Sequence, residues 1–321
     1  MSPLPTLAEI EAIAPAIDAV VPPTPQYSWP LLNARAGCEV WVKHENHTPV
    51  GAFKVRGGLA YFAELRQREP RLKGVVAATR GNHGQSVAFA ARRHGLPVVI
   101  VVPHGNSPEK NDAMRALGAE LVEHGEDFQA ALLHAGKIAT DRSWHAMPSF
   151  HSELVRGIAV STLHFLRSAP PLDTVYVPIG LGSGICAMMA ARDALGLRTA
   201  IVGVCSAHAD AISQSFAAGS IIPSPSATRI ADGLACSTPV AEALAHIRRG
   251  VKRIVTVSDD AVESALRICF SDTHNVAEGA AGAGLAAVLQ EKDRLAGRRV
   301  GVVLTGGNID RAVFARIMAA G

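Results

Sequence analysis

The most informative segment of the chain runs Lys43-His44-Glu45-Asn46-His47-Thr48-Pro49-Val50-Gly51-Ala52-Phe53-Lys54-Val55-Arg56-Gly57-Gly58. Within it, Lys54 follows a Gly-Ala-Phe turn and precedes Val-Arg-Gly-Gly, so apolar groups surround its stem while glycines let the backbone approach a ligand. A lysine shielded from water has a lowered pKa and can attack a carbonyl group to form an imine. The alternative is a lysine at a helix start that only extends its amine to solvent. The other motifs of the chain decide between a reactive lysine and this solvent-exposed one.

The composition excludes several classes of protein. The chain has 321 residues, of which 48% are hydrophobic and 18% charged, which predicts a large core divided between two lobes. A net charge of +3, scattered basic residues and only 5% aromatic residues do not favour nucleic-acid binding. No apolar run reaches the length of a membrane span, and the N-terminus lacks the pattern of a signal peptide. We therefore expect a cytoplasmic protein that binds neither nucleic acid nor membrane.

The cysteines and histidines show no metal-binding pattern. The five cysteines are irregularly spaced and contain no Cys-x-x-Cys pair, which predicts reduced thiols rather than a zinc site or disulfides. His44 and His47 lie between a predicted strand and a loop, and we expect their side chains to point to different faces. No metal site is predicted.

Strands and helices alternate along the chain. Apolar runs predict strands at residues 74–79, 97–103, 119–122, 174–178, 200–204, 253–257 and 300–304. Helical patterns begin near Asn82, Ser107, Phe128 and Ser152. This alternation predicts a doubly wound α/β fold, while Ser220–Pro239, rich in Pro, Ser and Thr, is interpreted as an ordered functional loop.

A second motif, Thr79-Arg80-Gly81-Asn82-His83-Gly84-Gln85-Ser86, lies where a predicted strand ends and a helix begins. Ligands bind at this edge of open α/β sheets, and the free N–H groups of a helix start favour an anion such as a carboxylate. The motif therefore predicts part of a binding site for an acidic group.

A third motif, Val177-Pro178-Ile179-Gly180-Leu181-Gly182-Ser183-Gly184-Ile185, is a glycine-rich turn between a strand and a helix, which is typical of a phosphate cradle. Gly182-x-Gly184-x-x-Ala187 also fits a dinucleotide fingerprint, which requires an acidic residue at the end of the next strand. That strand ends Val204-Cys205-Ser206, without an acid. A nucleotide-dependent oxidoreductase is therefore the disfavoured alternative.

A fourth motif, Leu304-Thr305-Gly306-Gly307-Asn308-Ile309-Asp310, again places a hydroxyl and glycines at a strand end. In their order along the chain, the four motifs resemble the fold type II pyridoxal-phosphate enzymes, and within them the threonine/serine dehydratase (ammonia-lyase) and serine racemase branch. Ala231-Asp232-Gly233 and Glu278-Gly279 also resemble segments that line the active site in this family.

The resemblance covers the chain from about residue 20 onwards and implies the two-lobe fold of the tryptophan synthase β-subunit-like enzymes. It implies a small lobe of residues 48–143, a large lobe that combines residues 1–47 with residues 144–321, and a homodimer.

The resemblance also implies a role for each matching residue. Lys54, next to Phe53, would form a Schiff base with pyridoxal 5'-phosphate, Asn82 would bind its ring hydroxyl, and Thr305 would face the pyridine nitrogen. The phosphate would lie in the turn formed by Gly180, Leu181, Gly182, Ser183 and Gly184, where the family usually carries four glycines. The substrate carboxylate would be surrounded by Thr79, Gly81, Asn82 and His83. Arg80 is expected to reach the substrate's carboxylate or β-substituent, or else to form a structural ion pair.

The reaction implied is an α,β-elimination that converts a β-hydroxy amino acid to a 2-oxo acid and ammonia. Threonine or serine is the expected substrate, and 3-hydroxyaspartate or phenylserine is the alternative. Racemases of this family place a serine where this chain has Arg80, and β-replacement enzymes carry different residues around the lysine, so both activities are disfavoured. A sensor that binds an amino acid without catalysis is disfavoured because Lys54, Asn82 and Thr305 are all present.

The same family often holds a divalent metal between a Glu and an Asp. Those positions are Cys205 and Ala211 in this chain, which leave no hard oxygen ligands. Activation by a metal is therefore not expected.

Overall fold

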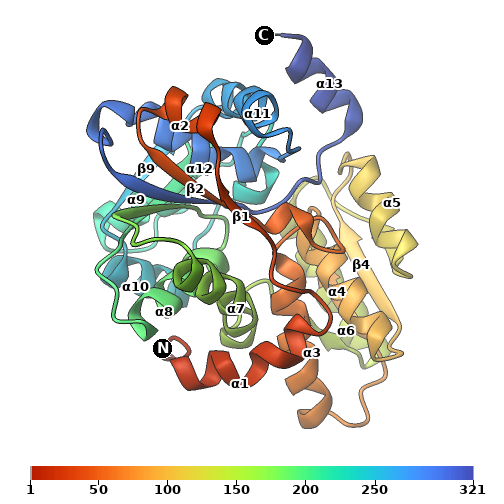
Figure 1. The fold of residues 1–321 in the computed structure, drawn as a ribbon. Helices are drawn as coiled ribbons and strands as arrows, with labels where there is room; N and C mark the ends of the chain where they lie inside the picture. The colour runs from red at the N-terminus through yellow and green to blue at the C-terminus, as the bar shows by residue number, and fades with distance from the viewer. Residues whose placement is uncertain (1, 321) are drawn as a thin grey trace.

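Two separate sheets organise the chain, which the computed structural model describes over residues 2–320 (Figure 1). The six-stranded sheet has the order β1-β2-β10-β7-β8-β9, and within the described residues only β1 is antiparallel to its neighbour. Its strands are β1 (Gln26–Ser28), β2 (Glu39–His44), β7 (Thr174–Pro178), β8 (Ala200–Ser206), β9 (Arg253–Val257) and β10 (Arg299–Leu304). The parallel four-stranded sheet, of order β5-β4-β3-β6, contains β3 (Val75–Ala78), β4 (Val98–Val102), β5 (Glu120–Glu123) and β6 (His145–Ala146).

Helices cover both sheets, and we call each sheet together with the helices grouped with it a lobe. The small lobe contains α3 (Lys54–Arg68), α4 (Asn82–Arg93), α5 (Pro108–Ala116) and α6 (Phe128–Arg142). The large lobe contains α1 (Leu7–Asp18), α2 (Pro30–Ala36), α7 (Ser152–Ser168), α8 (Ser183–Ala194), α9 (Ala211–Ala218), α10 (Ala241–Gly250), α11 (Asp259–Thr273), α12 (Gly279–Gln290) and α13 (Arg311–Ala319). Short 3₁₀ turns are η1 (Glu45–His47), η2 (Asp232–Leu234) and η3 (Lys292–Arg294). In Figure 1 the small lobe lies on the right, around β4, and the large lobe on the left.

The small sheet is covered on both faces, as its continuous apolar strands require. Successive residues of β3 alternate between two cores: Val75 and Ala77 pack with α3 and α4 residues, whereas Val76 and Ala78 pack with alanines of α6. All the residues of β3 and β4 are buried. The sheet therefore holds the loops that follow its strands on a rigid base.

The two lobes meet where α3 of the small lobe crosses α7 of the large lobe. The helices approach so closely that a Cβ atom on Gly157 would lie 2.2 Å from the carbonyl oxygen of Arg56. A Cβ atom on Gly57 would lie 2.8 Å from the carbonyl oxygen of Leu154. Glycines on both helices thus permit the contact that places the start of α3, and Lys54 with it, against the large lobe.

The predicted doubly wound α/β fold is confirmed, and each predicted strand lies within one or two residues of its expected bounds. Between residues 220 and 239 the only regular element is the short turn η2, as expected for a functional loop. The division into residues 48–143 and the remainder stays a prediction; β6, which joins the small sheet, lies just beyond that boundary. Within residues 2–320, no helix has the length and apolar character needed to span a bilayer.

The expectation for His44 and His47 was wrong. Their rings stack, with centroids 5.2 Å apart and an interplanar angle of 26°. The reason is the 3₁₀ turn η1, which begins directly after His44; because this helix type has three residues per turn, residues three apart lie on one side.

Candidate active site

Segments at the ends of strands from both sheets line one cavity. In the large sheet β10 lies between β2 and β7, so the segments after these three parallel strands meet at one edge. Thr305 follows β10, the segment that leads to Lys54 follows β2, and the turn that begins at Gly180 follows β7. The cavity, of about 220 Å³, is lined by all thirteen residues assigned from sequence: Phe53, Lys54, Thr79, Arg80, Gly81, Asn82, His83, Gly180, Leu181, Gly182, Ser183, Gly184 and Thr305. The structure thus brings these residues together, while their individual roles remain proposals.

Lys54 opens α3 and extends its amine into this cavity. Its Nζ donates a hydrogen bond to Ser183 Oγ at 2.8 Å, and burial lowers the pKa of Lys54 to about 8. The backbone on either side is fixed, because Phe53 N–H donates to the carbonyl oxygen of Thr305 at 2.9 Å and Ser86 Oγ donates to that of Lys54 at 2.7 Å. A substantial fraction of such an amine is neutral near pH 8, so Lys54 can act as a nucleophile or a base.

Two other buried lysines are not equivalent to Lys54. Burial also lowers the pKa of Lys43 to about 8, but its Nζ donates to the carbonyl oxygen of Thr24 at 2.7 Å and it does not line the cavity. Lys110 does line the cavity, and although burial opposes its charge, the carboxylates of Glu278 and Asp232 raise its pKa. Of these three lysines, only Lys54 both has a lowered pKa and lines the cavity.

The start of α4 offers an anion site beside Lys54. Thr79 Oγ1 accepts hydrogen bonds from the N–H groups of Gly81, at 3.0 Å, and Gly84, at 3.3 Å. Within residues 2–320, the N–H groups of Asn82 and His83 have no acceptor, since they open the helix. Free N–H groups at the positive end of a helix bind carboxylates and phosphates.

A second anion site lies at the start of α8, in the turn from Gly180 to Gly184. A Cβ atom on Gly180 would lie only 2.3 Å from the carbonyl oxygen of Gly233, so only glycine fits there. Gly182 caps the helix with φ of +105°, a left-handed conformation that favours glycine. Leu181 and Ser183 line the cavity, and within residues 2–320 their backbone N–H groups have no acceptor, so they are available to a phosphate.

A polar network joins the two lobes across the cavity. Asn82 Nδ2 donates to Glu278 Oε1 at 2.5 Å, and Asn308 Nδ2 donates to Asn82 Oδ1 at 2.8 Å. Lys110 Nζ lies 2.6 Å from Asp232 Oδ2 and 3.3 Å from Glu278 Oε2. Burial raises the pKa of Glu278, against the opposing effect of Lys110.

Sequence reasoning missed Lys110, which reads as an ordinary lysine in the first turn of a helix. A signal for its position exists at Gly81: a Cβ atom there would lie 2.6 Å from Lys110 Cδ, so glycine leaves room for the lysine to reach its two carboxylates.

His83 lies in the same cavity as a neutral imidazole. Burial, together with the nearby Lys54, lowers its pKa to about 3, and its Nε2 atom has no hydrogen-bond partner among the described residues. A neutral, unpartnered ring nitrogen can accept or donate a hydrogen bond to a ligand without adding charge.

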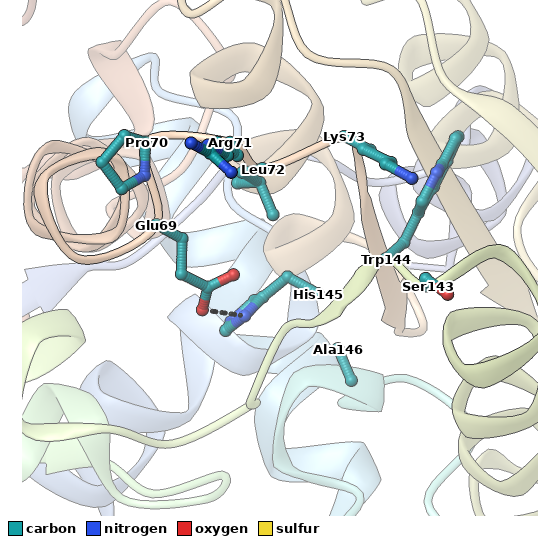
Figure 2. Close-up of a pocket in the computed structure, with 9 residues that line it drawn as sticks. All are labelled: Glu69, Pro70, Arg71, Leu72, Lys73, Ser143, Trp144, His145 and Ala146. Carbon is teal, nitrogen blue, oxygen red and sulfur yellow. Dashed lines mark hydrogen bonds and ion pairs between the residues drawn. The ribbon is translucent and has the colours of Figure 1, made fainter.

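A second hollow, of about 650 Å³, lies at the opposite edge of the small sheet, between residues 69–73 and 143–146 (Figure 2). The ring nitrogens of His145 lie 2.9 Å from Tyr61 Oη and 3.0 Å from Glu69 Oε1. This hollow adjoins the amino end of β3, whereas ligands of open α/β sheets bind at the carboxyl ends. None of the thirteen assigned residues lines it, so we place the active site in the cavity around Lys54.

Comparisons with known proteins show the family to which the chain belongs. Residues 17–306 match the family described as pyridoxal-phosphate dependent enzyme. The chain is 30% identical to L-threo-3-hydroxyaspartate ammonia-lyase of Saccharomyces cerevisiae, over 98% of this chain and 97% of that protein. It is 32% identical to phenylserine dehydratase of Ralstonia pickettii, over 99% and 98% of the two chains. The structure of maize serine racemase, 27% identical, superposes with a TM-score of 0.90 over 98% of this chain and 97% of that one. The chain therefore belongs to the pyridoxal-phosphate dependent enzymes of fold type II, in the branch of the ammonia-lyases and serine racemases.

Proposed function

We propose that this enzyme is a hydroxy amino acid dehydratase, an ammonia-lyase that converts a β-hydroxy amino acid to a 2-oxo acid and ammonia. The observation that carries the proposal is Lys54: a buried amine with a pKa of about 8 that shares its cavity with two helix starts, each able to hold an anion. Two lyases of this reaction class match almost the full length of the chain.

The residues of the cavity fit pyridoxal 5'-phosphate. Lys54 supplies the amine for its aldehyde, and the turn from Gly180 to Gly184 supplies the phosphate site, where a Cβ atom on Gly180 would not fit. Asn82 would serve the ring hydroxyl, and Thr305 the pyridine nitrogen. When bound, the cofactor withdraws electrons from the substrate's Cα, while the protein determines which bond breaks.

The protein's own groups account for the remaining steps. The N–H groups of Asn82 and His83 would hold the substrate carboxylate, and the free amine of Lys54 would take the Cα proton as a general base. The bond from Cβ to the hydroxyl would then break, and the hydroxyl would leave as water with a proton returned by Lys54. Hydrolysis of the released enamine-type product takes up one water, so the net products are a 2-oxo acid and ammonia.

Racemisation is the second candidate, because maize serine racemase superposes closely on this chain. It requires a second proton-transferring group on the face of the substrate opposite Lys54. The residue at the position where the racemases of this family place a serine is Arg80, whose guanidinium stays protonated and does not shuttle protons. We therefore expect elimination to dominate.

A substrate panel tests the proposed function. Purified enzyme loaded with the cofactor should release ammonia and 2-oxo acid in equal amounts from at least one of serine, threonine, threo-3-hydroxyaspartate and phenylserine. Chiral chromatography of the remaining substrate should show little of the opposite enantiomer. Inversion of the substrate without ammonia release would instead identify a racemase.

Gly180→Ala should weaken cofactor binding at least about tenfold, because the added Cβ would overlap the carbonyl oxygen of Gly233 and force the turn to shift. Cofactor titration followed by absorbance measures this change. Gly136→Ala is the matched control, since Gly136 lies in α6 with open space where its Cβ would be. Equal affinity of Gly180→Ala and wild type would refute a phosphate site in this turn.

Chelator treatment should leave the rate of elimination unchanged, and added magnesium should alter it little. Cys205 and Ala211, at the positions of the family's metal ligands, are both buried and offer no carboxylate. Steady-state assays before and after dialysis against a chelator provide the measurement. Saturable activation by magnesium would show that other residues supply the ligands.

We also propose that the enzyme acts in the cytoplasm as a homodimer on a small amino acid substrate. Sedimentation equilibrium should give twice the mass of the chain, and a monomer would contradict the dimer. Fractionation of cells should place the protein with cytoplasmic enzymes.

A further inference from the structure

Among the described charged side chains that line the cavity, one cation has no carboxylate to compensate it. Lys110 lies between the carboxylates of Asp232 and Glu278, so these three groups compensate one another. Lys54 is the group that reacts with the cofactor. The remaining charged side chain of the lining is Arg80.

Arg80 has no partner in the part of the chain that the structure describes. Among residues 2–320, no carboxylate lies within 4.0 Å of its guanidinium, and the guanidinium donates no hydrogen bond. The structural ion pair that the sequence left open is therefore not found. A partly buried guanidinium keeps its charge and is further desolvated when a ligand fills the cavity, so a ligand that offers it an anion is favoured.

The common carboxylate of amino acids does not require Arg80. The free N–H groups of Asn82 and His83 provide two donors at the positive end of α4, and the hydroxyl hydrogen of Thr79 is also available, since Thr79 Oγ1 acts only as an acceptor within the protein. A substrate with a single carboxylate therefore does not need Arg80, which lies directly before this helix start.

We propose that Arg80 binds a second carboxylate, carried on the substrate's β-carbon, and that the enzyme is selective for dicarboxylic β-hydroxy amino acids of the 3-hydroxyaspartate type. The inference rests on the proposed function and extends it to the substrate's side chain. Elimination of water and hydrolysis then give a 2-oxo dicarboxylic acid and ammonia.

Magnitudes favour a carboxylate over an aryl group as the partner of Arg80. A hydrogen bond to a charged group is stronger than one between neutral groups, and a guanidinium can form two such bonds to one carboxylate. A cation–π contact with a phenyl ring is weaker than such a pair of bonds and leaves the N–H donors of the guanidinium unsatisfied. Phenylserine is therefore expected to be the poorer substrate.

Arg80→Gln tests the inference by its effect on different substrates. Wild type should turn over L-threo-3-hydroxyaspartate with a kcat/KM at least about tenfold above that for serine. Arg80→Gln should lower kcat/KM for 3-hydroxyaspartate about 10- to 100-fold and change that for serine and threonine less than about threefold. Arg80→Lys keeps the charge but loses the geometry that allows two parallel hydrogen bonds. Its kcat/KM for 3-hydroxyaspartate should lie between those of wild type and Arg80→Gln. An equal loss on all substrates would show that Arg80 binds the α-carboxylate, and it would overturn the inference, as would unchanged kinetics or a preference for phenylserine.

A binding measurement separates this inference from the proposed function. L-aspartate and L-asparagine have nearly the same shape, differ in side-chain charge and lack the β-hydroxyl that elimination removes. Titration of the loaded enzyme, followed by cofactor absorbance, should show tighter binding of aspartate, and Arg80→Gln should abolish that difference. If wild type eliminates water from serine but binds aspartate no better than asparagine, the inference fails while the function stands. If no β-hydroxy amino acid releases ammonia, the function itself fails.

Discussion

Lys54→Ala is expected to lower the rate of elimination by at least about a thousandfold, because the substitution removes both the amine that holds the cofactor and the general base. No other residue of the cavity can replace it. Lys110 is held in its charged form by Glu278 and Asp232, and His83 is a weak base because burial and the nearby Lys54 lower its pKa to about 3. The measurement is 2-oxo acid release under saturating substrate, compared with wild type.

The fold of Lys54→Ala should be intact. The substitution removes a buried amine whose recorded hydrogen bond goes to Ser183, so the thermal midpoint should stay equal or rise slightly. Lys43→Met is a matched control for the loss of a lysine, because Lys43 is also buried but lies outside the cavity. This variant should be less stable than wild type, while the rate of its chemical step should stay unchanged. Turnover by Lys54→Ala at a rate near wild type would contradict the assignment.

Lys110→Met is expected to destabilise the protein by about 3 kcal/mol, since it leaves a buried carboxylate without its cation. Glu278 is almost fully buried, with its side chain 3% exposed, whereas Asp232, at 34%, retains contact with water. Most of the loss should therefore come from Glu278. The thermal midpoint should fall on the order of 6 °C, as measured by calorimetry.

The combination of Lys110→Met with Glu278→Gln isolates the cause of that loss. A glutamine amide can still accept the hydrogen bond from Asn82 but carries no charge, so the double variant should recover more than half of the lost stability. Lys137→Met, at an exposed lysine of α6, is the control and should have little effect. A double variant no more stable than Lys110→Met would show that charge burial is not the cause.

Three of the four motifs were predictable because each lies directly after a strand. The runs that form β3, β7 and β10 are short and apolar, and the polar or glycine-rich turns that follow them stand out from the sequence. The carboxyl ends of β7 and β10 meet at one edge of the large sheet, so local patterns were sufficient to bring their two turns together. β3 lies in the other sheet, and the family resemblance was needed to place its motif in the same cavity.

The contacts between the lobes were not predictable in the same way. Lys110, Asp232 and Glu278 come from a helix start, a loop turn and a helix cap that are far apart in the chain, and no local pattern records their approach. The N-terminal helix α1 does carry a local signal that could have located it, since Thr6 and Glu9 form a reciprocal capping box. The stacking of His44 on His47 depended on a single 3₁₀ turn, which short sequence patterns do not distinguish from an irregular loop.

The central claim, that Lys54 is the amine which holds the cofactor, is tested most directly by borohydride reduction of the loaded enzyme followed by peptide mapping. Reduction fixes the carbon–nitrogen link, so the modified lysine can be read by mass spectrometry. We expect one modified lysine in the chain, Lys54, and no label at that peptide in Lys54→Ala. A label on Lys43 or Lys110, or no covalent label at all, would contradict it.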